Sequence, residues 1–199
     1  MMKRSEILRF ILVGLVLFLG GCVLKQNPIE INHYTIDFKI KEINSKPSTK
    51  TIFIEEPVVN KSFNLTSIFY NTKPYLFEEY AENRWINLPS NMIYNQLIDS
   101  FSSSKIFPSV VSRDFKIKKE YVLKTEVIKL YHGFEGDKSY SIIKIKFDLV
   151  EDNKILKSFD YDKKVLAKEN NAYGYVKATN EGLKEILEDL LTKISSFSL

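Results

Sequence analysis

The chain has 199 residues with a net charge of +4, and it contains 14 Phe, 11 Tyr and one Trp. That length suits a single domain with a substantial hydrophobic core. Residues 1–21 hold three basic side chains and one acidic side chain, so the 178 residues that follow carry a net charge of only +2. Because nucleic-acid binding needs a clustered basic face, this balance excludes nucleic acid as a partner.

The N-terminus has the layout of a secretory signal peptide. Three basic residues precede an apolar run, residues 10–19, which is too short for a membrane span of about 20 apolar residues. The run ends in Leu-Gly-Gly-Cys22, the order of the bacterial lipobox. We predict a lipoprotein signal peptide over residues 1–21, cleavage before Cys22 and acylation of Cys22. The alternative is an uncleaved N-terminal anchor in which Cys22 is a buried small residue.

Residues 22–32 are expected to form the acylated N-terminus and a short polar tether. Cys22 is the one cysteine of the chain, so the acylated protein has neither a disulfide nor thiol chemistry. Valine follows Cys22, whereas an aspartate there tends to retain enteric lipoproteins in the inner membrane. We therefore expect a lipid-anchored protein of the cell envelope, at the outer membrane and facing the periplasm.

Residues 33–199 are predicted to fold as one α+β domain. Alternating apolar residues predict a strand over 33–40, and a short apolar run predicts a central strand over 51–55. A turn at 71–74 predicts a hairpin between 67–70 and 75–79. Further strands are expected over 106–111, 121–131, 141–150 and 155–165, with a loop over 132–137 and a turn over 151–154.

Two amphipathic helices are predicted, at about residues 89–103 and 172–197, because apolar residues recur there at helical spacing. Each helix must bury its apolar stripe against a sheet face. The last three strands follow each other through short connections, which favours antiparallel pairing. The expected architecture is thus a mostly antiparallel twisted sheet of about five to seven strands, packed by two helices.

The residue inventory argues against catalysis. Of the two histidines, His33 opens a predicted strand and His132 falls in a predicted hairpin loop, and neither has a partner at metal-binding spacing. The Gly-x-Ser-x-Gly motif and a Gly-rich phosphate loop are both absent from the sequence. We expect no catalytic residues, no cofactor and no metal site, and hence a protein that is not an enzyme.

The stretch from Tyr70 to Pro89 is rich in aromatic residues, prolines and an arginine. One interpretation is structural: an aromatic hairpin packs under the first helix, with Arg84 buttressing a loop. The other is functional, because exposed aromatic residues and arginine are typical of interface hot spots. On the second interpretation Tyr70, Tyr80, Arg84 and Trp85 are the candidate partner surface.

Several of these features occur together in one known family. The lipobox, a His-Tyr-Thr-Ile strand around Tyr34, a strand with Tyr70 and the hexapeptide Tyr80-Ala-Glu-Asn-Arg-Trp85 before an amphipathic helix resemble the ABC-type transport auxiliary lipoprotein family. The paraquat-inducible protein C type is its familiar branch. The similarity spans nearly the whole mature chain, and the Asn-Arg-Trp corner is its most specific part. The family usually continues with an acidic residue and proline, whereas here Ile86 to Leu88 separate Trp85 from Pro89.

The resemblance implies a non-enzymatic component of envelope phospholipid transport. Members of the family work beside MCE-domain proteins, which form hydrophobic conduits, and beside an inner-membrane ABC transporter. The resemblance carries over Cys22 as the lipid site and the Tyr70 and Trp85 region as a docking surface, and it supplies no catalytic residues. Two other functions stay open: an outer-membrane assembly lipoprotein of the lipopolysaccharide-assembly kind, and a periplasmic lipid-binding module. A homo-oligomer stays open as well.

Overall fold

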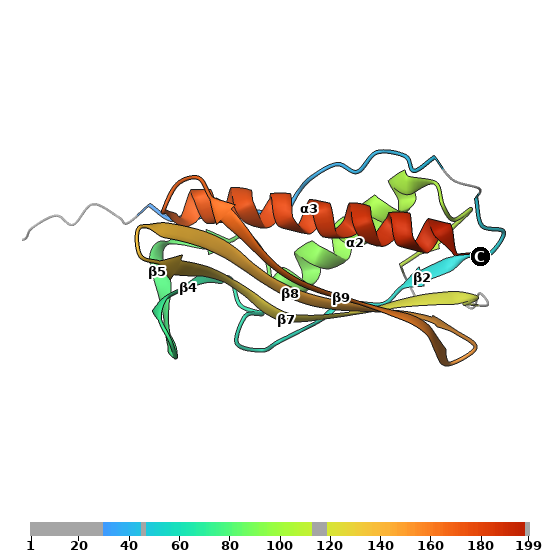
Figure 1. Cartoon of the computed structure of the whole chain (residues 1–199), viewed down its shortest axis with the longest axis horizontal. Helices are drawn as coiled ribbons and strands as arrows, with labels where there is room; N and C mark the ends of the chain where they lie inside the picture. Colours follow the sequence, from blue (N-terminus) through green and yellow to red (C-terminus); the bar gives the residue numbers. More distant parts are fainter. Residues whose placement is uncertain (1–29, 45–46, 113–118, 198–199) are drawn as a thin grey trace, which may run out of the picture. The chain divides into compact units, whose positions relative to one another are not determined.

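A computed structural model describes residues 30–44, 47–112 and 119–197 of the chain. The predicted signal peptide, Cys22 and most of the predicted tether lie outside these described residues. The unit Ile31–Leu199 is of the α+β class, as predicted. Two helices cover one face of a nine-stranded sheet (Figure 1).

The elements follow one another in the order strands, helix, strands, helix. The strands are β1 (Asn32–Tyr34), β2 (Ile52–Ile54), β3 (Val58–Val59), β4 (Ser67–Lys73), β5 (Leu76–Trp85), β6 (Val110–Val111), β7 (Tyr121–Glu135), β8 (Lys138–Glu151) and β9 (Lys154–Ala167). The helices are α2 (Pro89–Ser104) and α3 (Ala172–Ser196). Both helices and the β7–β8–β9 meander therefore lie where the sequence predicted them, within a few residues at each end.

Strand β7 is the central strand of the sheet and pairs with four other strands. Along one edge it pairs with β8 in an antiparallel ladder, and β8 continues to β9 in the same way. Along the other edge it pairs in parallel with β2, then β3, then β4. Beyond these, β2 pairs with β6, while β4 pairs with β5 and β5 with β1. The long ladders are antiparallel as expected, and five short parallel pairings make the whole sheet mixed.

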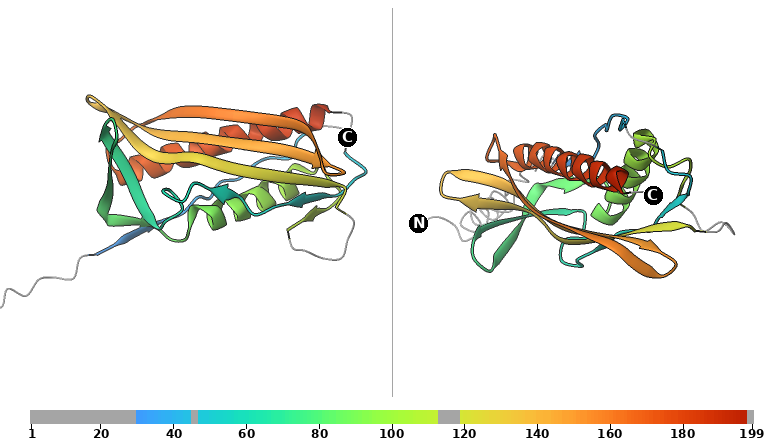
Figure 2. Two further views of the ribbon diagram at one scale, coloured as in Figure 1. Left: turned by 90° about the horizontal axis from the view of Figure 1, so that it is seen from below. Right: turned by 45° about the vertical axis from the view of Figure 1, so that its right-hand side comes forward.

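The core lies between the helices and one face of the sheet (Figure 2). In β8 the side chains of Ile143, Ile145 and Phe147 are at most 1% exposed, because the period-2 alternation of the strand turns them toward the helices. The residues between them include lysines, which face away from the helices. Helix α3 meets this face with Ile186, Leu190 and Ile194, all fully buried. The amphipathic patterns of the strand and the helix thus fix which faces meet.

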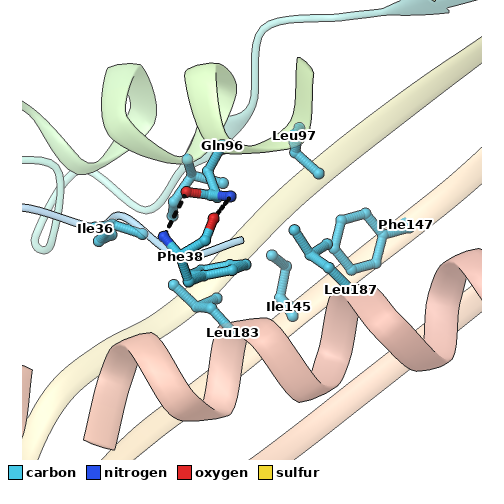
Figure 3. Close-up of a pocket in the computed structure, with 9 residues that line it drawn as sticks. Ile36, Phe38, Gln96, Leu97, Ile145, Phe147, Leu183 and Leu187 are labelled. Carbon is cyan, nitrogen blue, oxygen red and sulfur yellow. Dashed lines mark hydrogen bonds between the residues drawn. The ribbon is translucent and has the colours of Figure 1, made fainter. Parts of the chain in front are cut away.

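The predicted strand over residues 33–40 is wrong beyond its first two residues, because β1 ends at Tyr34. Residues 35–40 run on without strand pairing, and side chains of the two helices bond their backbone instead. Gln96 of α2 accepts a hydrogen bond from Phe38 N at 3.2 Å and donates one to Phe38 O at 2.8 Å (Figure 3). Asn180 of α3 accepts one from Asp37 N at 2.7 Å. We call residues 35–40 the strap.

The predicted loop over residues 132–137 is also wrong. Strand β7 continues to Glu135, and the turn to β8 consists of Gly136 and Asp137. Gly136 has φ +60°, a left-handed conformation that glycine adopts at low cost. The consequence for function is that His132 lies inside a strand and is fully buried.

Candidate functional site: the β4–β5 hairpin

The aromatic stretch singled out in the sequence forms the β4–β5 hairpin at one end of the sheet (Figure 1). The hairpin joins the rest of the sheet through parallel pairing of Tyr70 with His132 and of Asn71 with Gly133. Its register shifts twice, between Ser67 and Phe69 and between Tyr70 and Lys73. Such irregularities bend a strand and change which side chains face the core.

One face of the hairpin contributes to an aromatic cluster in the core, which we call the inner aromatic cluster. Its members are Tyr70, Tyr80, Trp85, His132, Phe134 and Tyr175. Ring centroids lie 4.8 Å apart for Tyr70 and Tyr80, and 5.1 Å apart for His132 and Tyr175. Tyr175 comes from α3, so the cluster connects the edge hairpin, the central strand and the helix. Aromatic pairs at these separations stabilise beyond their buried area.

His132 is the polar centre of this cluster. Its Nδ1 and the Tyr80 hydroxyl are 2.7 Å apart and share a hydrogen bond, whereas its Nε2 is buried and has no hydrogen-bond partner among the described residues. Burial lowers the pKa of His132 to about 4 and raises the pKa of Tyr80 to about 12. Both side chains are therefore neutral at physiological pH, and the pair is a structural contact rather than an acid–base pair.

The structure brings the four predicted partner residues together, but not as an exposed patch. Trp85 is only 2% exposed, so its assignment to a partner surface is wrong. Tyr70 and Tyr80 are half-buried and face the inner aromatic cluster. Arg84 donates hydrogen bonds to the carbonyl oxygens of Tyr80 and Asn83, so it buttresses the hairpin backbone. The structural interpretation therefore holds for Arg84, whereas among the described residues Trp85 contacts Tyr175 of α3 and not a ring of the first helix.

A second set of aromatic residues, which the sequence interpretation did not select, combines two residues on the opposite face of the hairpin with one from β7 and one from the segment before β4. We call Phe63, Phe69, Phe77 and Tyr131 the outer aromatic group. The ring centroid of Phe77 lies 5.0 Å from that of Tyr131 and 5.7 Å from that of Phe63. Phe63 also stacks on Tyr131 at 5.7 Å and contacts Phe69 at 6.5 Å. Phe77 is 45% exposed and the other three are half-buried, so the group presents aromatic surface to solvent.

Alternation along the strands places Phe69, Phe77 and Tyr131 on the face turned away from the helices, whereas Phe63 lies between β3 and β4 and also packs against the core. Tyr131 lies between Leu130 and His132, which both face the core. Phe77 and Tyr80 are three residues apart in β5 and so lie on opposite faces. This alternation was a usable signal in the sequence for Phe77 and Tyr80, although the register shift of the hairpin prevents it from extending to Trp85.

The part of the chain that the structure describes contains no cluster of three or more His, Cys, Asp or Glu side chains that could hold a metal ion. A cavity between the strap, the helices and the sheet measures about 10 Å³, and apolar side chains and Gln96 line it (Figure 3). That volume holds about one water molecule and is far too small for an acyl chain.

Neither described helix has the length and hydropathy needed to cross a membrane.

No protein-family model and no curated protein matches this sequence. Solved structures do match the fold. Protein XCC0632 from Xanthomonas campestris, of the DUF330 family, matches with a TM-score of 0.73 at 14% identity, over 82% of this chain and 96% of that one. An uncharacterized protein matches with a TM-score of 0.68 at 13% identity, over 83% and 99%. The hypothetical protein CT253 from Chlamydia trachomatis matches with 0.51 at 6%, over 75% and 98%. At these identities the comparison establishes a shared fold.

Proposed function

We propose that this protein is a lipid-anchored periplasmic adaptor. Acylated Cys22 would hold it at the outer membrane, and the domain would dock an MCE-domain assembly that works with an ABC transporter in phospholipid transport. The adaptor itself transforms no substrate. The lipobox and the resemblance to the ABC-type transport auxiliary lipoproteins support the anchor and the partner, and the fold is compatible with both.

The observation that carries the docking role is the outer aromatic group. Phe69, Phe77 and Tyr131 lie on the sheet face turned away from the two helices, Phe63 contacts all three, and Phe77 is 45% exposed. Aromatic side chains on a rigid scaffold are typical of interface hot spots, because they offer large contact areas with few rotatable bonds. Two of its members, Phe69 and Phe77, lie on the hairpin that contains Tyr70 and Trp85, the region that the resemblance marks for docking.

The two alternative functions receive less support. A lipid-binding module needs an apolar cavity, whereas the space between the helices and the sheet measures only about 10 Å³. A second hollow of about 450 Å³ is lined by the charged Glu55, Lys119 and Lys124 as well as by apolar residues. An outer-membrane assembly lipoprotein would dock on a β-barrel protein, and the same aromatic group would serve that purpose. The two docking roles therefore differ in the partner, which an experiment can identify.

The anchor is tested by metabolic labelling with palmitate and by intact mass of the purified protein. We expect label on the parent, loss of label in Cys22→Ala, and a mature chain that begins at Cys22. An unlabelled parent that retains residues 1–21 would refute the anchor.

The docking role is tested by site-specific photocrosslinking in living cells. A photoreactive phenylalanine analogue at Phe77 should crosslink to an MCE-domain protein. The same analogue at Ile155, which is 59% exposed at the distant β8–β9 turn, should not. A crosslink from Phe77 to a β-barrel protein would favour the assembly alternative, and equal crosslinking from both sites would overturn the docking surface.

A further inference from the structure

The tip of the β4–β5 hairpin presents an aromatic side chain entirely to solvent. Tyr75 has a relative exposure of 102%, higher than that of the other exposed apolar or aromatic residues of the described chain. Lys73 and Pro74 beside it are exposed as well. No ring contact or hydrogen bond of the Tyr75 side chain occurs among the described residues.

Tyr75 is also an unfavourable residue for its backbone conformation. Its φ of +69° is left-handed, where a residue with a bulky side chain is strained and glycine or asparagine is preferred. The turn is nevertheless held firmly. Asn71 Nδ2 donates hydrogen bonds to Lys73 O at 2.6 Å and to Leu76 O at 2.7 Å, across the base of the tip. The hairpin thus holds the backbone of an exposed tyrosine in a strained conformation, which costs conformational free energy. This points to a role of Tyr75 outside the folded domain.

The path of the chain indicates what lies near this tip. Strand β1 pairs in parallel with the last three residues of β5, Asn83 to Trp85. Ile31, the residue before β1, therefore lies on the side of β1 that leads along β5 toward the tip. Figures 1 and 2 show β1 and the hairpin at the same end of the sheet, away from the β8–β9 turn.

The segment from Cys22 to β1 is long enough to reach as far as the hairpin tip. The seven residues of β5 from Leu76 to Glu82 extend over about 23 Å. The ten residues from Cys22 to Ile31 can span at most about 35 Å. An anchor at Cys22 therefore keeps the bilayer surface within reach of the hairpin tip, and a contact that is weak alone becomes favourable when the anchor holds it close.

We propose that the Tyr75 tip rests in the headgroup layer of the bilayer that holds the Cys22 anchor. This inference rests on the lipid anchor of the proposed function and adds a second membrane contact. Tyrosine suits the interface, because its ring is apolar and its hydroxyl stays hydrated, and Lys73 can pair with lipid phosphates. Glu78 and Glu79, both exposed, follow closely and limit the contact to the tip. The outer aromatic group would then face sideways, parallel to the membrane surface.

The test supplies the anchor chemically, so that its result does not depend on whether cells acylate the protein. Residues 22–199 are coupled through Cys22, the chain's one thiol, to maleimide lipid in phosphatidylcholine vesicles. Tyr75→Trp is compared with Ile155→Trp, an exposed site at the far end of the sheet, and the emission of the buried Trp85 is subtracted using the parent protein. Quenching by lipids brominated near the headgroup reports the depth.

On coupling, Tyr75→Trp should shift its emission to the blue by several nanometres and lose at least a third of its intensity to brominated lipid, while Ile155→Trp should change in neither respect. If the two variants behave alike, the membrane contact is refuted, even where the photocrosslinking at Phe77 succeeds. A blue shift of Tyr75→Trp that grows with protein concentration without vesicles would assign the tip to a second copy and also overturn the proposal.

Discussion

The Tyr80 hydroxyl and His132 Nδ1 lie 2.7 Å apart and share a side-chain hydrogen bond between the edge hairpin and the centre of the core. His132 also stacks on Tyr175 of α3 at 5.1 Å between ring centroids, so one imidazole connects three elements. Because the ring is fully buried and its Nε2 has no partner among the described residues, it has no counter-charge to stabilise a proton. The hairpin is therefore linked to the core through a group that must stay neutral.

This neutrality predicts a pH-dependent stability. The pKa of His132 is about 4 in the folded protein, below the ordinary value of 6.5, so the unfolded chain binds a proton first as pH falls. The stabilisation is complete above about pH 6.5 and is lost between pH 6.5 and 4. Between pH 7.5 and 5 we expect the free energy of unfolding to fall by about 2 kcal/mol from this group, measured by urea denaturation.

The matched control is His132→Phe, which keeps an aromatic ring in the stack but cannot titrate. It also loses the hydrogen bond of Tyr80, so we expect it to be less stable at pH 7.5 by about 1 to 2 kcal/mol. Its stability should nevertheless change much less than that of the parent between pH 7.5 and 5. Parallel pH profiles for the two proteins would show that His132 is not the titrating group.

A second prediction concerns the approach of α3 to the sheet at Gly182. A Cβ placed there would lie 2.8 Å from both Ile143 Cδ1 of β8 and Val165 Cγ2 of β9. Both atoms are side-chain methyl carbons at this interface, so either these side chains or the helix would have to shift. We expect Gly182→Ala to destabilise the protein by about 1 to 3 kcal/mol in urea denaturation, although alanine has the higher helix propensity. Glu181→Ala, at the exposed neighbouring position, should be nearly neutral, and equal effects at both positions would contradict this account.

The helices and the meander were predictable because their signals are local. A strand such as β8 alternates lysines with buried apolar residues along its length, and α3 repeats its apolar stripe over about seven turns. The nine-stranded order was not predictable. Strands β2, β3 and β6 have only two or three residues each, and their parallel pairing with β7 or with one another depends on contacts far apart in the sequence.

The sequence did not predict which side chains of the candidate site face the core and which face solvent. Tyr80 and Trp85 are five residues apart, so simple alternation puts them on opposite sides of β5. The register shift between Ser67 and Phe69 lets both face the core.

The strap was predicted wrongly as a strand for a related reason. Its alternation of buried and exposed residues is real, but side-chain amides of Gln96 and Asn180 take the place of a neighbouring strand. Composition does not distinguish these arrangements.

The strap contacts give a third prediction. Gln96→Leu removes both hydrogen bonds to the backbone of Phe38 and leaves a partly buried N–H and C=O without these partners. We expect a loss of about 2 to 3 kcal/mol in the free energy of unfolding, with hydrogen exchange of the Phe38 amide faster by at least tenfold. Gln96→Glu keeps the acceptor for Phe38 N and should lose less protection there. If Gln96→Leu leaves the exchange of the Phe38 amide unchanged, the side chain does not hold the strap.

The last prediction separates the contribution of Tyr75 to the folding stability from its proposed contact outside the domain. Tyr75 holds a left-handed φ of +69° and is entirely exposed, so its side chain contributes strain and no packing. Asparagine tolerates this conformation better. Tyr75→Asn should therefore raise the free energy of unfolding by about 0.5 to 1 kcal/mol in urea denaturation, while Pro74→Ala in the same turn should not raise it. A destabilised Tyr75→Asn would mean that the tyrosine is kept for the fold, whereas a more stable variant would mean that the chain tolerates a strained tyrosine for a contact outside the domain.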